Sequence, residues 1–169
     1  MPIFMKAAAI DGDVVAESHK GWFQVEECSF DLQIDKDKVR ARLTDSDQAS
    51  EKPIEPEIGL FEVTKKTPGR SVPGLMAWIV SGDQLDEVRV DVCGDTTGDD
   101  GKWRSHMLYV LKGVLMKDYK MTMGDAEKGQ MSIKMQFSYE SLELTQSSYD
   151  RANQSKPSLK SSAVITKPQ

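Results

Sequence analysis

The sequence predicts one mainly-β domain with a single short helix, and three observations support this fold class. Most apolar residues recur with period two and alternate with polar ones, which is typical of strands that bury one face. Only one segment has apolar residues at helical spacing. The 169 residues, 38% of them hydrophobic, match the length of one domain with one core. We expect this domain to span residues 1–150.

The N-terminal part predicts a strand, a hairpin and a further strand. Apolar residues run through residues 3–10, and a turn at residues 11–13 is followed by two more valines at 14 and 15. Another strand is expected from residue 22 onwards. Ser29 and Asp31 would share one face of that strand, because alternate strand residues point the same way.

Residues 34–57 are expected to form a long projecting loop or an extended hairpin. The segment is rich in charge, is punctuated by Pro53 and Pro56, and has few apolar residues. Loops of this length in a compact domain usually have a function or are disordered.

A helix of about three turns is predicted from Ser71 to Gly82. Ser71 is a typical N-terminal cap, and Gly82 is typical of a helix C-terminus. Trp78 and Val80 add apolar surface outside the main stripe, so we expect the helix to be contacted there by more than its own domain. The stripe itself follows i, i+3, i+4, i+7 spacing: Val72, Leu75, Met76 and Ile79.

The C-terminal half predicts a meander of strands. Residues 88–93 alternate regularly, and residues 94–101 are rich in the turn formers Asp and Gly. The strand that begins at Trp103 is apolar on both faces, which indicates a central position. Gly113 within it indicates a bend or bulge of the kind that barrels use at corners.

Residues 119–139 predict a hairpin with a charged tip at 125–129. Past this hairpin the apolar positions change from odd to even, at Leu142 and Leu144, which a bulge would produce. Residues 151–169 are rich in Ser, Lys and Pro and predict a flexible tail.

The composition disfavours nucleic acid and membrane partners. The net charge of −5 and the pI near 5.1 do not suit a phosphate-binding surface. The longest apolar run, residues 72–80, is far shorter than the ~20 residues that cross a bilayer, so no membrane insertion is expected. The first residues lack the pattern of a signal peptide, and synthesis in the cytosol is expected.

No catalytic, metal or cofactor site is predicted. Cys28 and Cys93 lie in alternating segments, which favours buried free thiols over a disulfide. With only two cysteines and two histidines, widely spaced, structural zinc is not expected. His19 is expected in an exposed loop, and Ser105 and His106 would point to opposite faces of a strand.

The order of these blocks resembles the haemolysin-coregulated protein (Hcp) family, the inner-tube subunit of bacterial type VI secretion systems. The similarity covers residues 1–150 as a series of ordered blocks and includes no catalytic motif. The blocks are Gly59–Lys66, the helix start Ser71–Met76 with its end at Ser81–Gly82, the strand Tyr109–Leu115, and the closing strand Met131–Tyr139 with Leu142 and Leu144.

The resemblance implies a compact β-barrel of two sheets with one short flanking helix. It also implies hexameric rings that stack into a secreted tube inside a contractile sheath, with a spike protein at the tip and small effector proteins in the lumen. Such a protein is exported without a signal peptide, has no cofactor or metal, and is not an enzyme. The implied contact residues are Val39, Leu43, Ile54 and Ile58 between rings, Trp78 and Val80 between subunits, and Ser29 and Asp31 facing the lumen.

Three alternatives remain at this level. A tail-tube protein of another phage-like contractile particle would share the barrel and the ring. A monomeric β-barrel binding module would keep the strands and form no ring. An enzyme would require a pocket of converging polar groups, for which His106 is the candidate residue.

Overall fold

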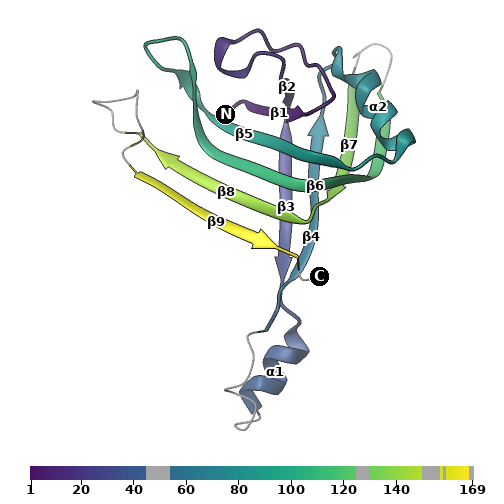
Figure 1. The fold of residues 1–169 in the computed structure, drawn as a ribbon, viewed down its shortest axis with the longest axis vertical. Helices are drawn as coiled ribbons and strands as arrows, with labels where there is room; N and C mark the ends of the chain where they lie inside the picture. The colour runs from purple at the N-terminus through teal and green to yellow at the C-terminus, as the bar shows by residue number, and fades with distance from the viewer. Residues whose placement is uncertain (45–53, 125–129, 150–156, 158, 168–169) are drawn as a thin grey trace.

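The structure, a computed structural model, describes residues 1–44, 54–124, 130–149, 157 and 159–167, and it is mainly β (Figure 1). The expected tip at 125–129 and the first part of the expected tail lie outside the described residues. In chain order the elements are β1 (Ile3–Ala7), the 3-10 helix η1 (Glu17–His19), β2 (Phe23–Val25), β3 (Glu27–Gln33), α1 (Lys36–Thr44), β4 (Glu57–Lys65), α2 (Ser71–Ser81), β5 (Leu85–Thr97), β6 (Trp103–Met123), β7 (Met131–Ser138), β8 (Ser141–Ser148) and β9 (Leu159–Thr166).

The strands form two antiparallel sheets that share the long strand β6. Sheet A has the order β2-β1-β5-β6-β8-β9, and sheet B has the order β6-β7-β4-β3. The first half of β6 pairs with β5 and β8, whereas residues from Leu115 onwards pair with β7. Gly113 has φ +60 at the point where β6 passes from one sheet to the other, which confirms the predicted bend.

The expected two-sheet barrel is present, but its hydrogen-bonded order does not close among the described strands. The order begins at β2 and ends at β3. These two strands are separated in the chain only by Glu26, whose amide donates to the carbonyl of Thr64 at 2.9 Å. The sheets are therefore joined by β6 on one side and by the continuous β2–β3 chain on the other.

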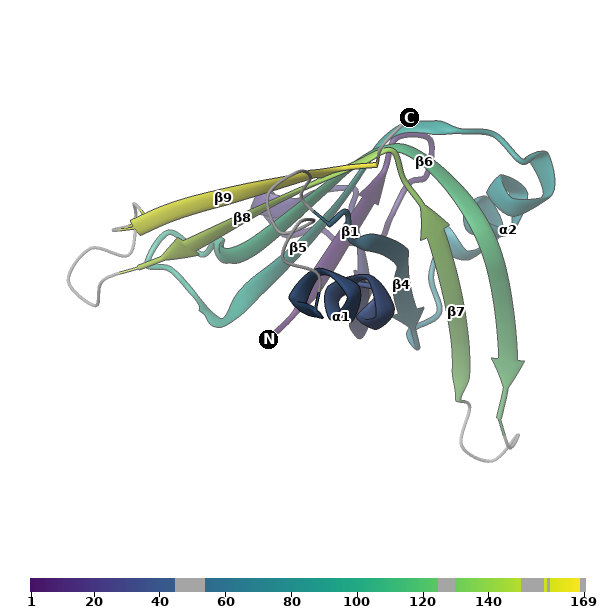
Figure 2. The same ribbon diagram turned by 90° about the horizontal axis from the view of Figure 1, so that it is seen from below.

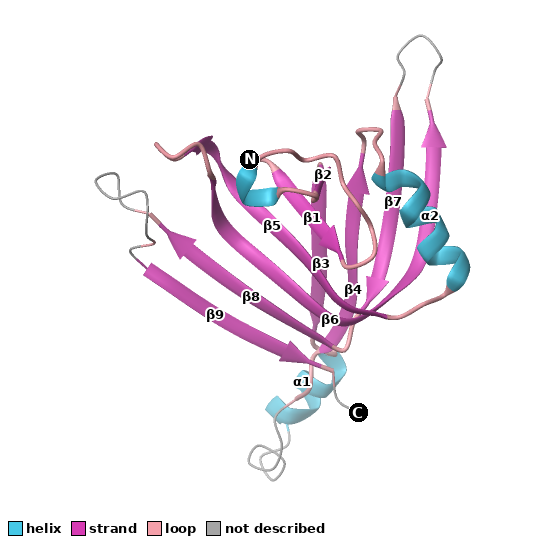
Figure 3. Cartoon of the chain, turned by 45° about the horizontal axis from the view of Figure 1, so that its top comes forward, coloured by secondary structure: helices cyan, strands magenta, loops and turns pink. Residues whose placement is uncertain are grey.

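The core lies between the two sheets and is capped by α2 (Figures 2 and 3). Successive rows across sheet B place apolar residues inward; in one row Phe30 pairs with Phe61 and Phe61 with Phe137. The Trp78 ring of α2 stacks on Phe137, with centroids 5.2 Å apart and planes 15° from parallel. Aromatic packing of this kind adds specific geometry to the apolar burial.

The N-terminal hairpin predicted at Val14 and Val15 is wrong. The chain instead makes a wide loop through η1 before β2, and its ends are held by Gly12 and Val14 amides that donate to the carbonyls of Gly21 and Trp22, each at 3.0 Å. A Cβ at Gly12 would lie 2.0 Å from the Trp22 carbonyl oxygen. Glycine is required there because the two backbones approach so closely.

The change of apolar parity at Leu142 marks a corner, not a bulge within one strand. β7 pairs with the second half of β6 and β8 with the first half, so the chain crosses from sheet B to sheet A at residues 139–140. The tail prediction also differs from the structure, because Leu159–Thr166 pairs with β8 over its whole length. Serine and lysine in this segment are compatible with an exposed edge strand.

Candidate self-assembly surfaces

The first candidate surface is a projection formed by the ends of β3 and β4 and by α1, which extends away from the sheets (Figure 1). The expected loop or hairpin thus contains a helix, which begins after Asp35. The Asp35 carboxylate accepts the Asp37 amide at 2.9 Å, as an N-terminal cap does. No described residue of α1 is fully buried, and most of the helix is exposed.

The residues proposed for ring-to-ring contact all lie on this projection. Leu43 is 82% exposed on the last turn of α1, and Val39 is half-buried one turn earlier. Ile54 lies before β4 and Ile58 is the second residue of β4, and both are half-buried. The projection also exposes Leu32 and Ile34, so exposed apolar side chains gather among its described residues, while Ile58 packs against the core.

Helix α2 provides a second surface, and its two proposed interface residues differ. Val80 is 81% exposed and Met76 is 46% exposed, so both are free for contact with a neighbour. Trp78 is only 5% exposed, and its Nε1–H donates to the Asp83 carbonyl at 2.8 Å. The prediction that Trp78 lies at a subunit interface is therefore wrong: it belongs to the core.

The apolar stripe of α2 is rotated relative to the predicted one. Leu75 and Trp78 face inward with Ser71, whereas Met76 faces outward. Arg70, not Ser71, occupies the N-cap position, because Ser71 already lies inside the helix and is buried. Gly82 ends the helix in the left-handed conformation, with φ +68 and its amide donating to the Trp78 carbonyl, as predicted.

The outer face of sheet B is a third surface, and here it is called the polar face. It contains the two predicted lumen residues, Ser29 and Asp31, which are both exposed on β3. Ser29 pairs with Glu62, Glu62 pairs with Gln136, and Gln136 pairs with Asp118, so one polar row crosses four strands. The Gln136 side-chain amide donates to the Glu62 carboxylate within this row.

A groove of about 400 Å³ runs over the polar face. Both signs of charge line it: Glu27, Glu62 and Asp118 on the acidic side, and Lys120 and Lys134 on the basic side. These side chains are exposed. Behind them Cys28 faces inward, and its burial raises the pKa of the thiol. The polar face is thus hydrated and of mixed charge, while its reverse is part of the core.

The edge strand β9 is a fourth surface. It pairs only with β8 among the described strands, and all of its residues except Ile165 are exposed. Leu159 and Val164 are 72% and 65% exposed. A free edge of this length presents unpaired backbone groups to which another strand can be added.

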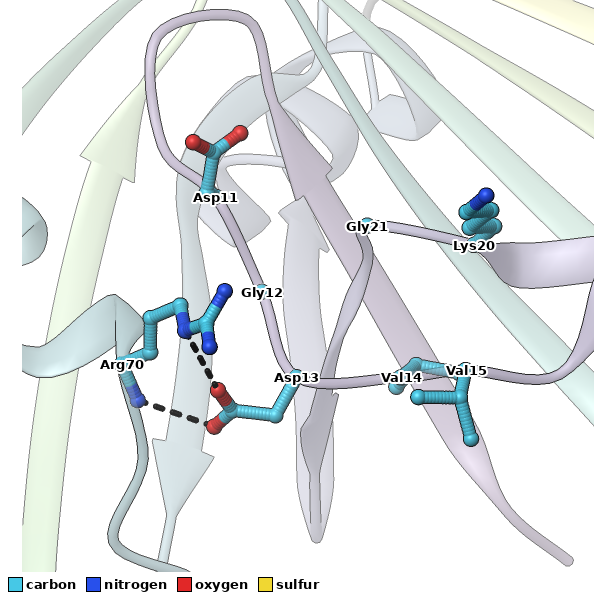
Figure 4. Close-up of a pocket in the computed structure, with 8 residues that line it drawn as sticks. All are labelled: Asp11, Gly12, Asp13, Val14, Val15, Lys20, Gly21 and Arg70. Carbon is cyan, nitrogen blue, oxygen red and sulfur yellow. Dashed lines mark hydrogen bonds and ion pairs between the residues drawn. The ribbon is translucent and has the colours of Figure 1, made fainter.

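The cleft beside the N-terminal loop has a volume of about 450 Å³ and is formed by the backbone of the loop and by Arg70 (Figure 4). The Asp13 carboxylate accepts the Arg70 amide at 2.9 Å, and its second oxygen lies 3.7 Å from Arg70 Nε. Asp11 and Lys20 point into solvent around it. This ion pair ties the loop to the start of α2, and it provides no nucleophile with an adjacent base.

The two histidines lie in different settings. His106 is half-buried and has the Tyr149 ring edge-on at 5.7 Å, while Ser105 donates to Asp91. The register between β5 and β6 shifts at His106, so the divergence of Ser105 and His106 stays a prediction. The expectation that His19 is exposed is wrong, because it is 3% exposed and hydrogen-bonded to Asp91.

These surfaces define a class of protein: a mainly-β subunit whose exposed helix, strand edge and polar sheet face are available for contact with other chains. Two cysteines are free in the structure, Cys93 buried and Cys28 half-buried. Among the described residues, no helix is both long and apolar enough to span a bilayer.

The comparisons with known proteins agree with this class. Residues 4–146 match the family described as "Type VI secretion system effector, Hcp". The chain therefore belongs to the Hcp family, and its role is that of a type VI secretion tube subunit. No curated protein sequence matches the chain significantly.

Solved structures show the same fold at low sequence identity. Hcp1 from Salmonella typhimurium is 11% identical, with a TM-score of 0.69 over 98% of this chain and 93% of that one. A type VI secretion system effector from Yersinia pestis is 12% identical, with a TM-score of 0.67 over 97% and 98%. The secreted protein Hcp3 from Pseudomonas aeruginosa is 15% identical, with a TM-score of 0.59 over 99% of each chain.

Proposed function

We propose that six copies of this chain form a ring and that the rings stack into the expelled tube of a type VI secretion system. The observation that carries the proposal is the family match over residues 4–146, joined to exposed apolar surface at two separate places on the subunit. A heterologous contact between two different patches closes into a ring when its rotation divides a full turn. Val80 on α2 belongs to the contact between subunits.

The projection makes the contact between rings in this proposal. It lies at one end of β3 and β4, whose direction leads away from the sheets (Figure 1). Leu43, Val39, Ile54 and Ile58 supply its apolar surface. A protrusion along the strand direction reaches the next ring if these strands run along the tube axis.

The polar face lines the channel in this proposal, with Ser29 and Asp31 among its residues. Its support is the row of polar side chains across four strands, three of them exposed and Gln136 half-buried, which suits a water-filled lumen. Small effector proteins travel there, and the sheath and spike are the partners outside the ring. The subunit is made in the cytosol, is exported without a signal peptide, and performs no catalysis.

Imaging and mass measurement of the purified protein test this proposal. We expect rings of six times 18.9 kDa, seen in electron micrographs and measured by light scattering. Val80→Asp should release single subunits, because it places a charge in an apolar contact. Val15→Asp on the N-terminal loop makes the same change at a valine that is 90% exposed and lies outside the proposed contacts, so it is the matched control. A monomer that persists at high concentration would favour the binding-module alternative and overturn the ring.

A further inference from the structure

Three side chains of the types that bind metal ions meet beneath the N-terminal loop. His19 of η1 lies 3% exposed, Asp91 of β5 lies 6% exposed, and Cys93 of β5 is fully buried. His19 Nε2 lies 2.7 Å from Asp91 Oδ2 and 3.8 Å from Cys93 Sγ. All three donor atoms lie within 4.8 Å of one another. We propose that His19, Asp91 and Cys93 bind one zinc ion.

The separations between the donors suit a tetrahedral ion. With zinc bonds of about 2.0 Å to nitrogen or oxygen and about 2.3 Å to sulfur, neighbouring donors lie roughly 3.3–3.7 Å apart. The His19–Cys93 separation of 3.8 Å is already close to this value. The His19–Asp91 separation of 2.7 Å must open by about 0.6 Å, which a small rotation of the carboxylate provides.

The types of donor select zinc among the common divalent ions. An imidazole nitrogen and a thiolate sulfur favour zinc over magnesium or calcium, which prefer several oxygens. The surroundings of the imidazole are apolar: Phe4 stacks on the His19 ring at 4.5 Å, and Trp22 meets it edge-on at 4.9 Å. Such walls limit access of water and strengthen the bonds between the ion and its ligands.

Neighbouring hydroxyl groups orient two of the donors. Ser18 Oγ lies 2.9 Å from His19 Nδ1, and Ser105 donates to the second oxygen of Asp91. In the zinc-bound form His19 Nδ1–H donates to Ser18, which leaves the Nε2 lone pair for the metal. Without an ion, burial and the nearby Asp91 raise the pKa of the Cys93 thiol to about 12. The charge of the zinc ion releases that proton to solvent and leaves the thiolate as ligand.

Sequence spacing does not reveal this site. His19 is 72 residues from Asp91 and 74 residues from Cys93, and the usual close pairs of zinc ligands are absent. The expectation that the chain holds no metal rested on counting four Cys and His ligands. The structure brings together one of the two histidines, one of the two cysteines and a carboxylate.

Cobalt spectroscopy of the full-length, chelator-treated protein tests the proposal, because a cobalt–thiolate bond gives a charge-transfer absorption. We expect this band to saturate at one Co²⁺ per chain and to disappear when Zn²⁺ is added. The chain supplies its own matched controls. The double variant Cys28→Ser/His106→Gln retains only Cys93 and His19, and it should keep the band and the stoichiometry.

The band should be lost in Cys93→Ser and in His19→Gln. Absence of the band in the wild type, its loss in the double variant, or its persistence in Cys93→Ser would overturn the site. Because these two ligands are buried, circular dichroism checks that each variant folds; if one does not, the double variant decides by itself. Zinc at about a hundredfold excess over its Kd should also raise the unfolding temperature of the wild type by about 5–10 °C. None of these measurements depends on ring formation.

Discussion

Trp78 and Val80 lie two positions apart on one helix, and their surroundings are opposite. Trp78 is packed against Phe137, whereas Val80 is 81% exposed. We predict that Trp78→Ala destabilises the isolated subunit by about 3–5 kcal/mol, because it opens a cavity in the core. Val80→Ala should change the stability by less than about 0.5 kcal/mol. Urea unfolding of both variants measures the difference, and equal effects would contradict the assignment of Trp78 to the core.

Gly113 is a second position where one residue sets the fold. Its φ of +60 is unfavourable for other residues, and a Cβ there would lie 2.5 Å from the Glu140 Cδ atom. Gly82 has a similar φ of +68, but nothing lies within 4 Å of an added Cβ. We predict that Gly113→Ala costs about 1 kcal/mol more than Gly82→Ala, since only the first displaces a neighbouring side chain.

A second background separates strain from crowding at this corner. In a Glu140→Ala background the extra cost of Gly113→Ala should vanish, leaving only the cost of the left-handed conformation. Thermal or urea unfolding of the four proteins completes this double-mutant cycle. If the extra cost persists without the Glu140 side chain, crowding by Glu140 is not its cause.

At the residue scale, the sequence predicted backbone conformation better than it predicted which residues contact one another in the fold. The helix end at Gly82 and the bend at Gly113 were predicted correctly, because a glycine within a helical or strand pattern marks such a position without any knowledge of tertiary contacts. Trp78 was misplaced because a wide apolar stripe does not say which of its edges faces the sheet. The His19–Asp91 contact was missed because it joins a loop to a strand 72 residues away. A buried histidine and an exposed one look alike in sequence.

At the scale of elements, β9 is the clearest difference from the sequence-based expectation. All eight of its residues pair with β8, and Leu142 of β8, opposite Ile165, is fully buried. We predict that a chain ending at Tyr149 is less stable by about 2–4 kcal/mol, because several backbone hydrogen bonds contribute about 0.5–1.5 kcal/mol each. Denaturant unfolding measures this loss.

The truncation should also promote aggregation, because β8 becomes an exposed edge. Val164→Lys is the control: it changes an exposed side chain of β9 and keeps the backbone ladder, so stability and solubility should be retained. A truncated chain as stable as the full one would support the flexible tail that composition suggested. Polar edge strands resemble tails in composition because only their backbone takes part in the sheet.

Elements whose apolar residues recur with a clear period were predicted from the sequence. Elements that are defined by their contacts with other elements were not. The strands β5, β6 and β7 and the helix α2 follow from alternation and helical spacing. The nine residues of α1 have almost no amphipathic pattern and no buried residue, so the sequence offered only its charge. The corner between β7 and β8 gave a parity signal, but a bulge and a change of sheet produce the same signal.

At the scale of the whole molecule, the two faces of sheet B have opposite characters. The inner face carries Phe61, Met135 and Phe137, all fully buried, and the outer face is the polar face with its mixed charges. Sheet B is a single layer, and it therefore separates the apolar core on its inner face from a hydrated surface on its outer face. A closed ring with this sheet innermost would have a hydrated channel, whereas the exposed apolar residues of α1 and α2 would be covered by other copies.

Thiol labelling of stacked tubes tests which face lines the channel. Ser29→Cys, in a background carrying Cys28→Ser, places a thiol on the polar face, and Glu143→Cys in the same background places one on the exposed surface of β8 in sheet A. A maleimide attached to a polymer too large to enter the channel should modify both in dissociated subunits. In stacked tubes we predict that Ser29→Cys becomes protected and Glu143→Cys stays reactive, because the polymer reaches only the outside. Gel shifts after timed labelling measure both rates, and the residual Cys93 thiol is buried and should remain unmodified in each protein. Equal labelling of Ser29→Cys in tubes and in subunits would remove the polar face from the lumen and leave another face of the subunit to line it.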